Sequence, residues 1–108
     1  MTLDIYPPGV LTQSMITDLK QRALHRTKIL EGQIRGLQKM IDADEYCMDI
    51  VTQSLAVQKS LSSLNKLIIE NHLRTHISDM MTSGNETHKE MAVDDLIKLY
   101  ELSNVRSK

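Results

Sequence analysis

The 108-residue sequence contains no phenylalanine, no tryptophan and only one cysteine. A single thiol cannot form an internal disulfide, so a reducing cytoplasm is the expected compartment. With three tyrosines as its only aromatic residues, the chain has to build a core from Leu, Ile, Val, Met and Ala. It is long enough for one domain at most, and such a core buries little apolar surface in a single copy. Oligomerisation is the usual remedy.

Long apolar runs are missing as well. No stretch reaches the length of a signal-peptide core or of a membrane-spanning helix, so we expect no membrane partner. Hydrophobic residues still make up 41% of the sequence, which is typical of a folded chain. These counts predict a cytoplasmic protein.

Helical periodicity fills most of the sequence. The first predicted helix runs from about Thr17 to Ile41, with an apolar stripe at steps of four, three and four: Leu30, Ile34, Leu37 and Ile41. Residues 1–16 are expected to form a flexible arm, residues 17–103 the helical domain, and residues 104–108 a short polar tail.

The stretch from Asp44 to about Met81 contains no Gly and no Pro and predicts one long central helix with Asp44 as its cap. A third helix is predicted from about His88 to Ser103, because Thr87 and Glu90 have the spacing of a capping box. The fold class is therefore all-α, a three-helix protomer with a long central helix.

The net charge of −1 argues against nucleic acid as a partner, but the charge distribution does not. The first predicted helix carries two acidic residues and six basic ones: Lys20, Arg22, Arg26, Lys28, Arg35 and Lys39. A basic face of this kind suits DNA phosphates, although a solvated helix flank has the same composition. No helix-turn-helix, zinc-finger or ribbon motif can be read that decides between the two.

Three side chains capable of binding a metal lie on the central helix. Cys47 lies near its start, and His72 and His76 lie four residues apart on one face toward its end. One helix separates Cys47 from His72 by roughly 38 Å, so the three cannot meet within one copy. They can meet if two copies lie antiparallel, which makes two equivalent sites per dimer. A thiolate and two imidazoles suit copper, nickel, cobalt or zinc better than calcium or magnesium.

Nucleophilic catalysis by Cys47 is the enzymatic alternative. The sequence offers no oxyanion-stabilising loop, glycine-rich turn or substrate pocket to support it, and Leu73 stands where a zinc protease needs its general base. We therefore expect no catalytic residues and no enzyme. Two alternatives of a different class remain: a helical interaction module with Cys47 buried and the histidines solvated, and a metal store.

Three segments carry a family resemblance: "HRTKILEGQIRGLQKMI" (His25 to Ile41), "YCMDIVTQSLAVQKSL" (Tyr46 to Leu61) and "NHLRTH" (Asn71 to His76). From about Thr17 to Tyr100 the chain resembles the CsoR/RcnR-type metal-sensing transcriptional repressors of bacteria. The resemblance implies an antiparallel dimer that assembles into a homotetramer, with metal bound between protomers. It also implies allosteric control, in which the metal-free protein binds operator DNA and metal binding releases it.

The resemblance assigns roles at the metal site. Cys47 matches the thiolate ligand of one protomer and His72 the histidine ligand of the other, while His76 stands where the copper-sensing branch has a second cysteine. Tyr46 and Asp95 fall where that branch has residues that link the ligand histidine to the C-terminal helix, with Asp in place of Glu.

DNA contact is implied for basic residues of the first two helices. Arg26 matches a family residue implicated in operator contact, and Ser63 replaces a family arginine, so Lys59 is expected to supply part of the basic surface instead. The set is Arg26, Lys28, Arg35, Lys39 and Lys59.

The metal is expected to be Cu(I). The segments around Cys47 and His72 are similar to those of the copper-sensing branch, and soft ligands favour Cu(I). His76 is instead a feature of the nickel and cobalt branch, which also uses a histidine near its N-terminus, whereas no histidine precedes His25 here. Ni(II), Co(II) and Zn(II) remain alternatives.

Overall fold

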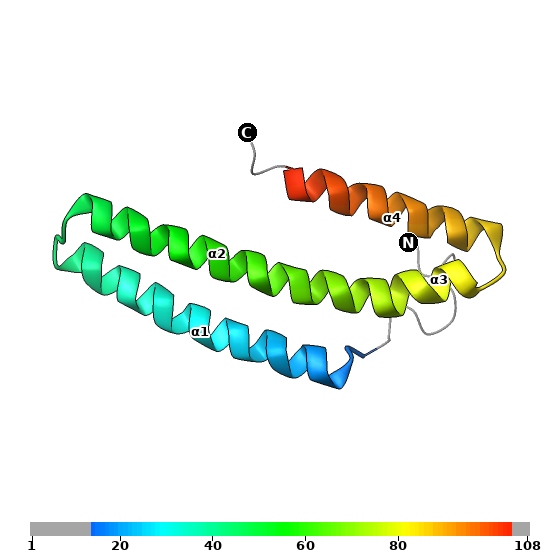
Figure 1. The fold of residues 1–108 in the computed structure, drawn as a ribbon, viewed down its shortest axis with the longest axis horizontal. Helices are drawn as coiled ribbons and strands as arrows, with labels where there is room; N and C mark the ends of the chain where they lie inside the picture. The colour runs from blue at the N-terminus through cyan, green and yellow to red at the C-terminus, as the bar shows by residue number, and fades with distance from the viewer. Residues whose placement is uncertain (1–13, 105–108) are drawn as a thin grey trace. The chain divides into compact units, whose positions relative to one another are not determined.

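The computed structural model describes residues 14–104, and every element in that range is helical (Figure 1). The elements are α1 (Thr17–Asp42), α2 (Cys47–His72), a π-helical turn η2 (Leu73–Ile77), α3 (Ser78–Thr82) and α4 (Glu86–Asn104). The prediction of an all-α chain with a long central helix is confirmed. Most of the predicted arm and tail, residues 1–13 and 105–108, lie outside the described residues. In the described range no helix is long and apolar enough to cross a membrane.

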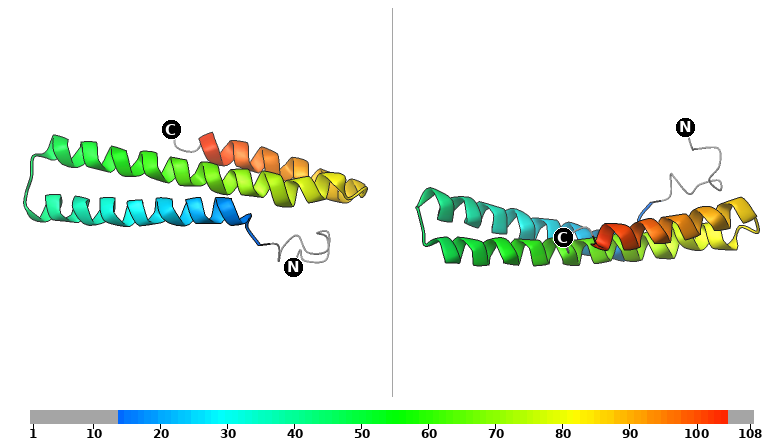
Figure 2. Two further views of the ribbon diagram at one scale, coloured as in Figure 1. Left: turned by 60° about the horizontal axis from the view of Figure 1, so that its bottom comes forward. Right: turned by 90° about the horizontal axis from the view of Figure 1, so that it is seen from above.

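The chain divides into two compact units, one containing Met15–Asn71 and the other the described residues from His72 onward. The first unit is an antiparallel hairpin of α1 and most of α2, as both views in Figure 2 show. Its buried residues follow a helical seam on each partner: Leu19, Ala23 and Leu30 on α1, and Val57, Leu67 and Asn71 on α2. Steps of four and seven on α1, and of ten and four on α2, keep these residues on the side of each helix that faces its partner, which is why this sequence pairs the two helices.

The C-terminus of α1 is closed by a Schellman turn. The Glu45 N–H donates to the Met40 carbonyl (3.0 Å) and the Asp44 N–H to the Ile41 carbonyl (3.1 Å). This turn needs a left-handed residue, and Asp44 supplies it with φ of 52°. The prediction that Asp44 caps the central helix is therefore wrong, because its backbone is used to end α1.

The N-terminal cap of α2 is the backbone of Tyr46. The Tyr46 carbonyl accepts hydrogen bonds from Asp49 N–H (2.9 Å) and Ile50 N–H (3.2 Å). Cys47 is consequently the first residue of α2, in the first turn where the sequence predicts it.

The long central helix is interrupted by one π-helical turn, Leu73–Ile77. The Ser78 N–H donates to the Leu73 carbonyl, five residues back, before α-helix resumes. The prediction of one uninterrupted helix to Met81 is thus wrong by a single turn. The sequence around this turn contains neither Gly nor Pro, so the usual signals of a helix break are missing. One added residue rotates the following turns by about 100° relative to a continuous α-helix.

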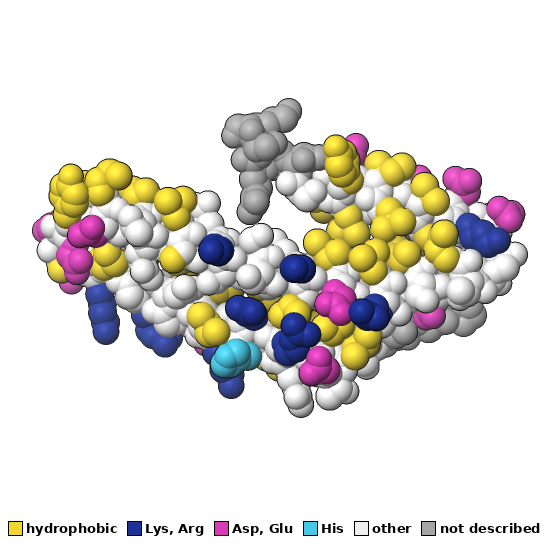
Figure 3. Space-filling view, viewed as in Figure 1, with side chains coloured by type: hydrophobic (Ala, Val, Ile, Leu, Met, Phe, Trp, Pro, Cys, Tyr) yellow, Lys and Arg dark blue, Asp and Glu magenta, His cyan; other side chains and the backbone are white. Residues whose placement is uncertain are grey.

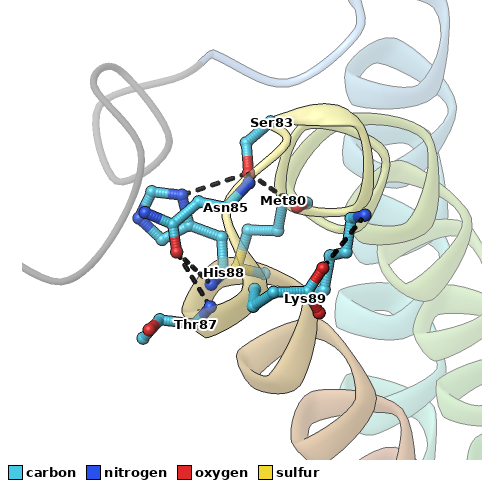
Figure 4. Close-up of polar contacts among 7 residues, drawn as sticks. Met80, Ser83, Asn85, Thr87, His88 and Lys89 are labelled. Carbon is cyan, nitrogen blue, oxygen red and sulfur yellow. Dashed lines mark hydrogen bonds and ion pairs between the residues drawn. The ribbon is translucent and has the colours of Figure 1, made fainter.

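Gly84 and Asn85 form the turn into α4, and Figure 4 shows Asn85 with its hydrogen-bond partners. Gly84 has φ of 78°, which suits a glycine after a helix. The Asn85 Oδ1 accepts hydrogen bonds from Thr87 N–H (2.8 Å) and His88 N–H (3.3 Å), so Asn85 caps α4. The capping box predicted at Thr87 is wrong, because the helix begins at Glu86 and its cap comes two residues earlier.

The second unit has a small apolar core. Ile77, Met80 and Ala92 are buried together, and Met91 packs against them. This cluster fixes α4 against η2 and α3, and thereby places one face of α4 beside the π-helical turn.

Replacing Asp44 with Gly should raise the free energy of unfolding by on the order of 0.5–1 kcal/mol. Glycine adopts the left-handed backbone without steric cost, and the substitution removes a carboxylate from the negative end of the α1 dipole. Both gains in stability are partly offset because glycine gives the unfolded chain more conformational freedom. Thermal unfolding followed by circular dichroism at fixed protein concentration measures the change. Ala43→Gly is the matched control, because Ala43 has φ of −85° and gains nothing from glycine. Equal loss of stability in both variants would contradict the Schellman assignment.

Candidate functional site

His72, His76 and Asp95 form a chain of polar contacts in the second unit. The Nδ1 atoms of His72 and His76 are 3.0 Å apart, and the Nε2 of His72 lies 2.8 Å from the Oδ2 of Asp95. Three elements supply these side chains: the last residue of α2, the π-helical turn and α4. The structure thus brings together two of the three predicted metal ligands and one of the two residues expected to support them.

The contacts determine which nitrogen of His72 carries a proton. An ionised Asp95 can only accept, so the Nε2 of His72 is the donor in that hydrogen bond. A neutral imidazole has one N–H, which leaves the lone pair of His72 Nδ1 directed at His76. The Nδ1–H of His76 then donates to this lone pair, so a single proton lies between the two Nδ1 atoms.

This arrangement fits a metal with nitrogen ligands. The two Nδ1 atoms point at one proton, and a metal cation can take the place of that proton. A carboxylate that accepts from the other ring nitrogen of a ligand histidine is the usual means of setting the tautomer of that histidine. The side chains of His72 and Asp95 are 29% and 33% exposed, so ions can reach them from solvent. Within residues 14–104, however, no three His, Cys, Asp or Glu side chains form a group able to hold a metal by themselves. A further ligand is required.

Cys47 and Tyr46 lie elsewhere in the chain. Cys47 is the first residue of α2 and His72 the last, so one helix holds them apart. Both Cys47 and Tyr46 are exposed, Tyr46 at 71% of its surface. The prediction of a thiolate ligand therefore requires a second copy of the chain.

The predicted DNA-contacting residues are all exposed: Arg26, Lys28, Arg35 and Lys39 on α1, and Lys59 on α2. Figure 3 shows Lys and Arg side chains distributed along the hairpin. Arg26 also lines a surface groove on one face of α1 together with Asp18, Gln21, Arg22, His25 and Ile29. Arg22 and His25 lie within one helical turn of Arg26, and Arg22 forms an ion pair with Asp18 in this groove at 3.7 Å.

Asn71 is a candidate for a functional role that the sequence alone does not reveal. It is a polar residue at the end of the apolar α2 seam, and it is 6% exposed. Its Oδ1 accepts a hydrogen bond from the Ile16 N–H at 2.9 Å. Its place four residues after Leu67, on the seam, is the only sequence signal.

Several known proteins are similar to this chain. The model of a family described as metal-sensitive transcriptional repressor matches residues 19–101. The copper-sensing transcriptional repressor CsoR of Mycobacterium ulcerans (strain Agy99) is 38% identical over 82 residues, covering 76% of this chain and 68% of that protein. CsoR of Bacillus subtilis (strain 168) is 33% identical over 82 residues, covering 76% and 78%.

A solved structure has the same fold. The crystal structure of the copper-sensing repressor CsoR with Cu(I) from Geobacillus thermodenitrificans NG80-2 matches with a TM-score of 0.67 and 27% sequence identity. The match covers 82% of this chain and 92% of that one.

In the metal-free protein at mildly alkaline pH, we expect His72 to be the Nε2–H tautomer, because Asp95 accepts from that nitrogen. Two-bond ¹H–¹⁵N correlation spectra of the imidazole rings measure this directly. Asp95→Ala should convert His72 to a mixture of tautomers, whereas the exposed neighbour variant Asp94→Ala should leave the spectrum unchanged. An unaltered His72 pattern in Asp95→Ala would mean that Asp95 does not set the tautomer.

Proposed function

Because this chain belongs to the family of metal-sensitive transcriptional repressors, we propose that it represses transcription in the metal-free state and leaves its operator on binding Cu(I). The observation that carries the proposal is the convergence of His72 Nδ1 and His76 Nδ1, with Asp95 behind His72. Repression and release need no catalytic group, and we assign the chain no enzymatic activity. Its place of action is the cytoplasm, where operator DNA is found.

The choice of Cu(I) rests on ligand chemistry and on the relatives. A thiolate and two imidazoles form a soft donor set, which favours Cu(I) over the harder Ni(II) and Co(II). The similar repressors from Mycobacterium ulcerans and Bacillus subtilis are named as copper-sensing. Ni(II), Co(II) and Zn(II) are the competing ions, and His76 is the ligand that favours them.

We assign the ligands to two protomers. Cys47 at the start of α2 in one protomer faces His72 and His76 at the end of α2 in the other, which requires an antiparallel dimer with two equivalent sites. Tyr46 precedes the thiolate and adds a phenol near the partner's histidine. Exposed apolar side chains at the joined end of the hairpin support self-association (Figure 3): Ile34, Ile41, Met48, Val51 and Leu55.

A second apolar face supports assembly beyond a dimer. On α4, exposed residues recur at helical spacing on one side: Val93, Leu96, Ile97 and Tyr100. Ala92, about a quarter turn around the helix from the centre of this face, packs into the core of its own unit. A face of this kind is typical of a helix that packs against another subunit, and we assign it to the tetramer.

Metal binding at this site requires His76 and Cys47 to give up protons. Asp95 keeps Nε2–H of His72 engaged, so the His72 Nδ1 lone pair is free for a ligand role once His76 gives up its Nδ1 proton. Cys47 must lose its thiol proton as well, so binding releases protons and weakens at acid pH. When bound, Cu(I) supplies a link between the start of one α2 and the end of the other.

Repression and metal binding oppose each other through α1. The basic residues of α1 and Lys59 contact phosphates in the DNA-bound arrangement, and linking the two α2 helices disfavours that arrangement. By linkage, operator DNA must weaken Cu(I) binding by the same factor by which Cu(I) weakens DNA binding.

Replacing Cys47 with Ala should give a repressor that binds DNA and ignores metal. Cys47 is exposed, so truncation leaves no cavity, and operator affinity without metal should stay within about threefold of the parent's. The assay is fluorescence anisotropy of a duplex selected from a random library by the metal-free protein, with and without excess Cu(I). The control is His88→Ala, a histidine outside the site, which should respond as the parent does. Loss of DNA binding by metal-free Cys47→Ala would instead identify a structural cysteine.

The same titrations separate the competing classes. A metal store binds Cu(I), with thiolate-to-metal absorption, but leaves the anisotropy of any selected duplex unchanged. A helical interaction module selects no duplex and shows no such absorption. A nickel or cobalt sensor releases the duplex with Ni(II) or Co(II) and fails to do so with Cu(I).

Replacing Arg26 with Ala should weaken operator binding and flatten its salt dependence. Removing one interaction with a DNA phosphate lowers the slope of log K against log salt by about 0.9 for each protomer bound. Anisotropy titrations at several salt concentrations give the slope, and Lys98→Ala on α4 is the control, because it removes an exposed lysine outside the DNA-contacting set. Equal slopes for Arg26→Ala and the parent would exclude the groove on α1 from the DNA interface.

A further inference from the structure

Asn71 makes a side-chain hydrogen bond that joins two distant parts of the sequence within the hairpin unit. Its Oδ1 accepts from the backbone N–H of Ile16, a residue 55 positions earlier, at 2.9 Å. The side chain is buried, at 6% exposed. It lies one turn beyond an apolar cluster in which Leu19, Ala23 and Leu67 are buried, with Met15 and Leu64 packed against them.

A leucine at this position would suit the seam better than an asparagine. The α2 seam is otherwise apolar at its nearest buried positions, and a buried amide costs free energy that its hydrogen bonds only offset. Packing alone therefore gives no reason for Asn71. Buried polar residues in helical seams are best attested as devices that select one arrangement of helices over another.

Ile16, the partner of Asn71, is the N-cap residue of α1. Its carbonyl accepts the Lys20 N–H at 2.8 Å, which is the first hydrogen bond of the helix, and the Ile16 side chain makes no capping hydrogen bond. The Asn71 amide thus holds the residue from which α1 starts. The apolar cluster holds the two helices together through contacts without direction, whereas the hydrogen bond ties one atom at the end of α2 to one atom at the start of α1.

The same turns of α1 carry the surface groove that Arg22 and Arg26 line. Leu19 and Ala23 pack against α2. Arg22, His25 and Arg26, from the same and the next turn of α1, line the groove. The residue after Asn71 is His72, whose imidazole is engaged with His76 and Asp95. One end of this connection is therefore at the candidate metal site, and the other is at the helix expected to contact DNA.

From this geometry we infer that Asn71 is the positioning residue that couples the two functions: it transmits a displacement of the His72 turn to the N-terminus of α1. This inference rests on the proposed function. A shift or rotation of the α2 end when His72 takes a ligand moves the Asn71 Oδ1, and the Ile16 N–H must follow it or lose its partner. When the N–H follows, Arg22 and Arg26 change their placement relative to α2; without the bond, the movement is not transmitted and the apolar cluster keeps the metal-free arrangement.

The hydrogen bond can be removed from either side. Asn71→Leu deletes the acceptor and leaves an apolar seam residue. Ile16→Pro deletes the donor, and the Ile16 φ of −57° already suits proline. The carbonyl that accepts the Lys20 N–H is retained in both variants. Asn71→Asp keeps an acceptor oxygen at a helix N-terminus, where a carboxylate is favoured, and is the rescue variant. Asn65→Leu, an exposed asparagine on the same helix, is the control.

The measured quantity is the coupling ratio, the operator Kd with excess Cu(I) divided by the Kd without it, using the library-selected duplex. We expect Asn71→Leu and Ile16→Pro each to lower this ratio at least fivefold. Cu(I) affinity of the DNA-free protein and the operator Kd without metal should stay within threefold of the parent. The double variant should lose no more than either single variant, because both remove the same bond. Asn71→Asp and Asn65→Leu should keep the parent ratio.

Several results would overturn the inference. A parent-like ratio in either bond-deleting variant, shown to be helical by circular dichroism, would assign Asn71 a structural role only, as would additive losses in the double variant. If one variant does not fold, the other decides alone, since each deletes the whole bond. Failure of the proposed function is distinguishable, because the parent itself would then show a ratio of one.

Discussion

An α-helix cannot bring its own ends together, and this constraint decides how the proposed metal site can be built. Cys47 and His72 are the first and last residues of α2. At about 1.5 Å per residue they are separated by more than the reach of any pair of side chains. A ligand set containing both must come from two chains. The exposed thiol, the exposed apolar residues at the joined end of the hairpin and the lack of a complete metal-holding group in residues 14–104 all agree with a site completed by a partner.

The fold of a single chain brings together half of each proposed site. The π-helical turn carries His76 next to His72, and the small core of Ile77, Met80 and Ala92 holds α4 so that Asp95 meets the outer nitrogen of His72. The other half, Cys47, lies exposed at the N-terminus of α2. The hairpin connects the end of α2 to α1 through Asn71 and Ile16. In the proposed mechanism the sensing residues of α2 lie on the helix that pairs with α1, and α1 carries four of the five residues proposed to contact DNA.

Sequence reasoning predicts helices well and their junctions poorly. The apolar period places α1 within one residue of its observed end, Asp42, because periodicity reports burial along the whole helix. An aspartate at position 44 is compatible with two roles, the N-cap of α2 and the left-handed residue that ends α1. Only the Schellman hydrogen bonds decide between these roles. The π-helical turn has no Gly or Pro to mark it. The His72–His76 pair is visible as an i, i+4 spacing, whereas Asp95 comes only from the family resemblance. The Asn71–Ile16 bond depends on the register of the hairpin, which no local pattern encodes.

The most direct test of a site shared between protomers is subunit complementation. Cys47→Ala and His72→Ala chains are purified separately, mixed under conditions that exchange subunits, and titrated with Cu(I) while thiolate-to-metal absorption is followed. Each variant alone should bind poorly, and the mixture should recover up to one intact site per heterodimer, because the Cys47 of one chain meets the His72 and His76 of the other. If exchange is verified and the mixture binds no better than its separate components, the shared site is contradicted.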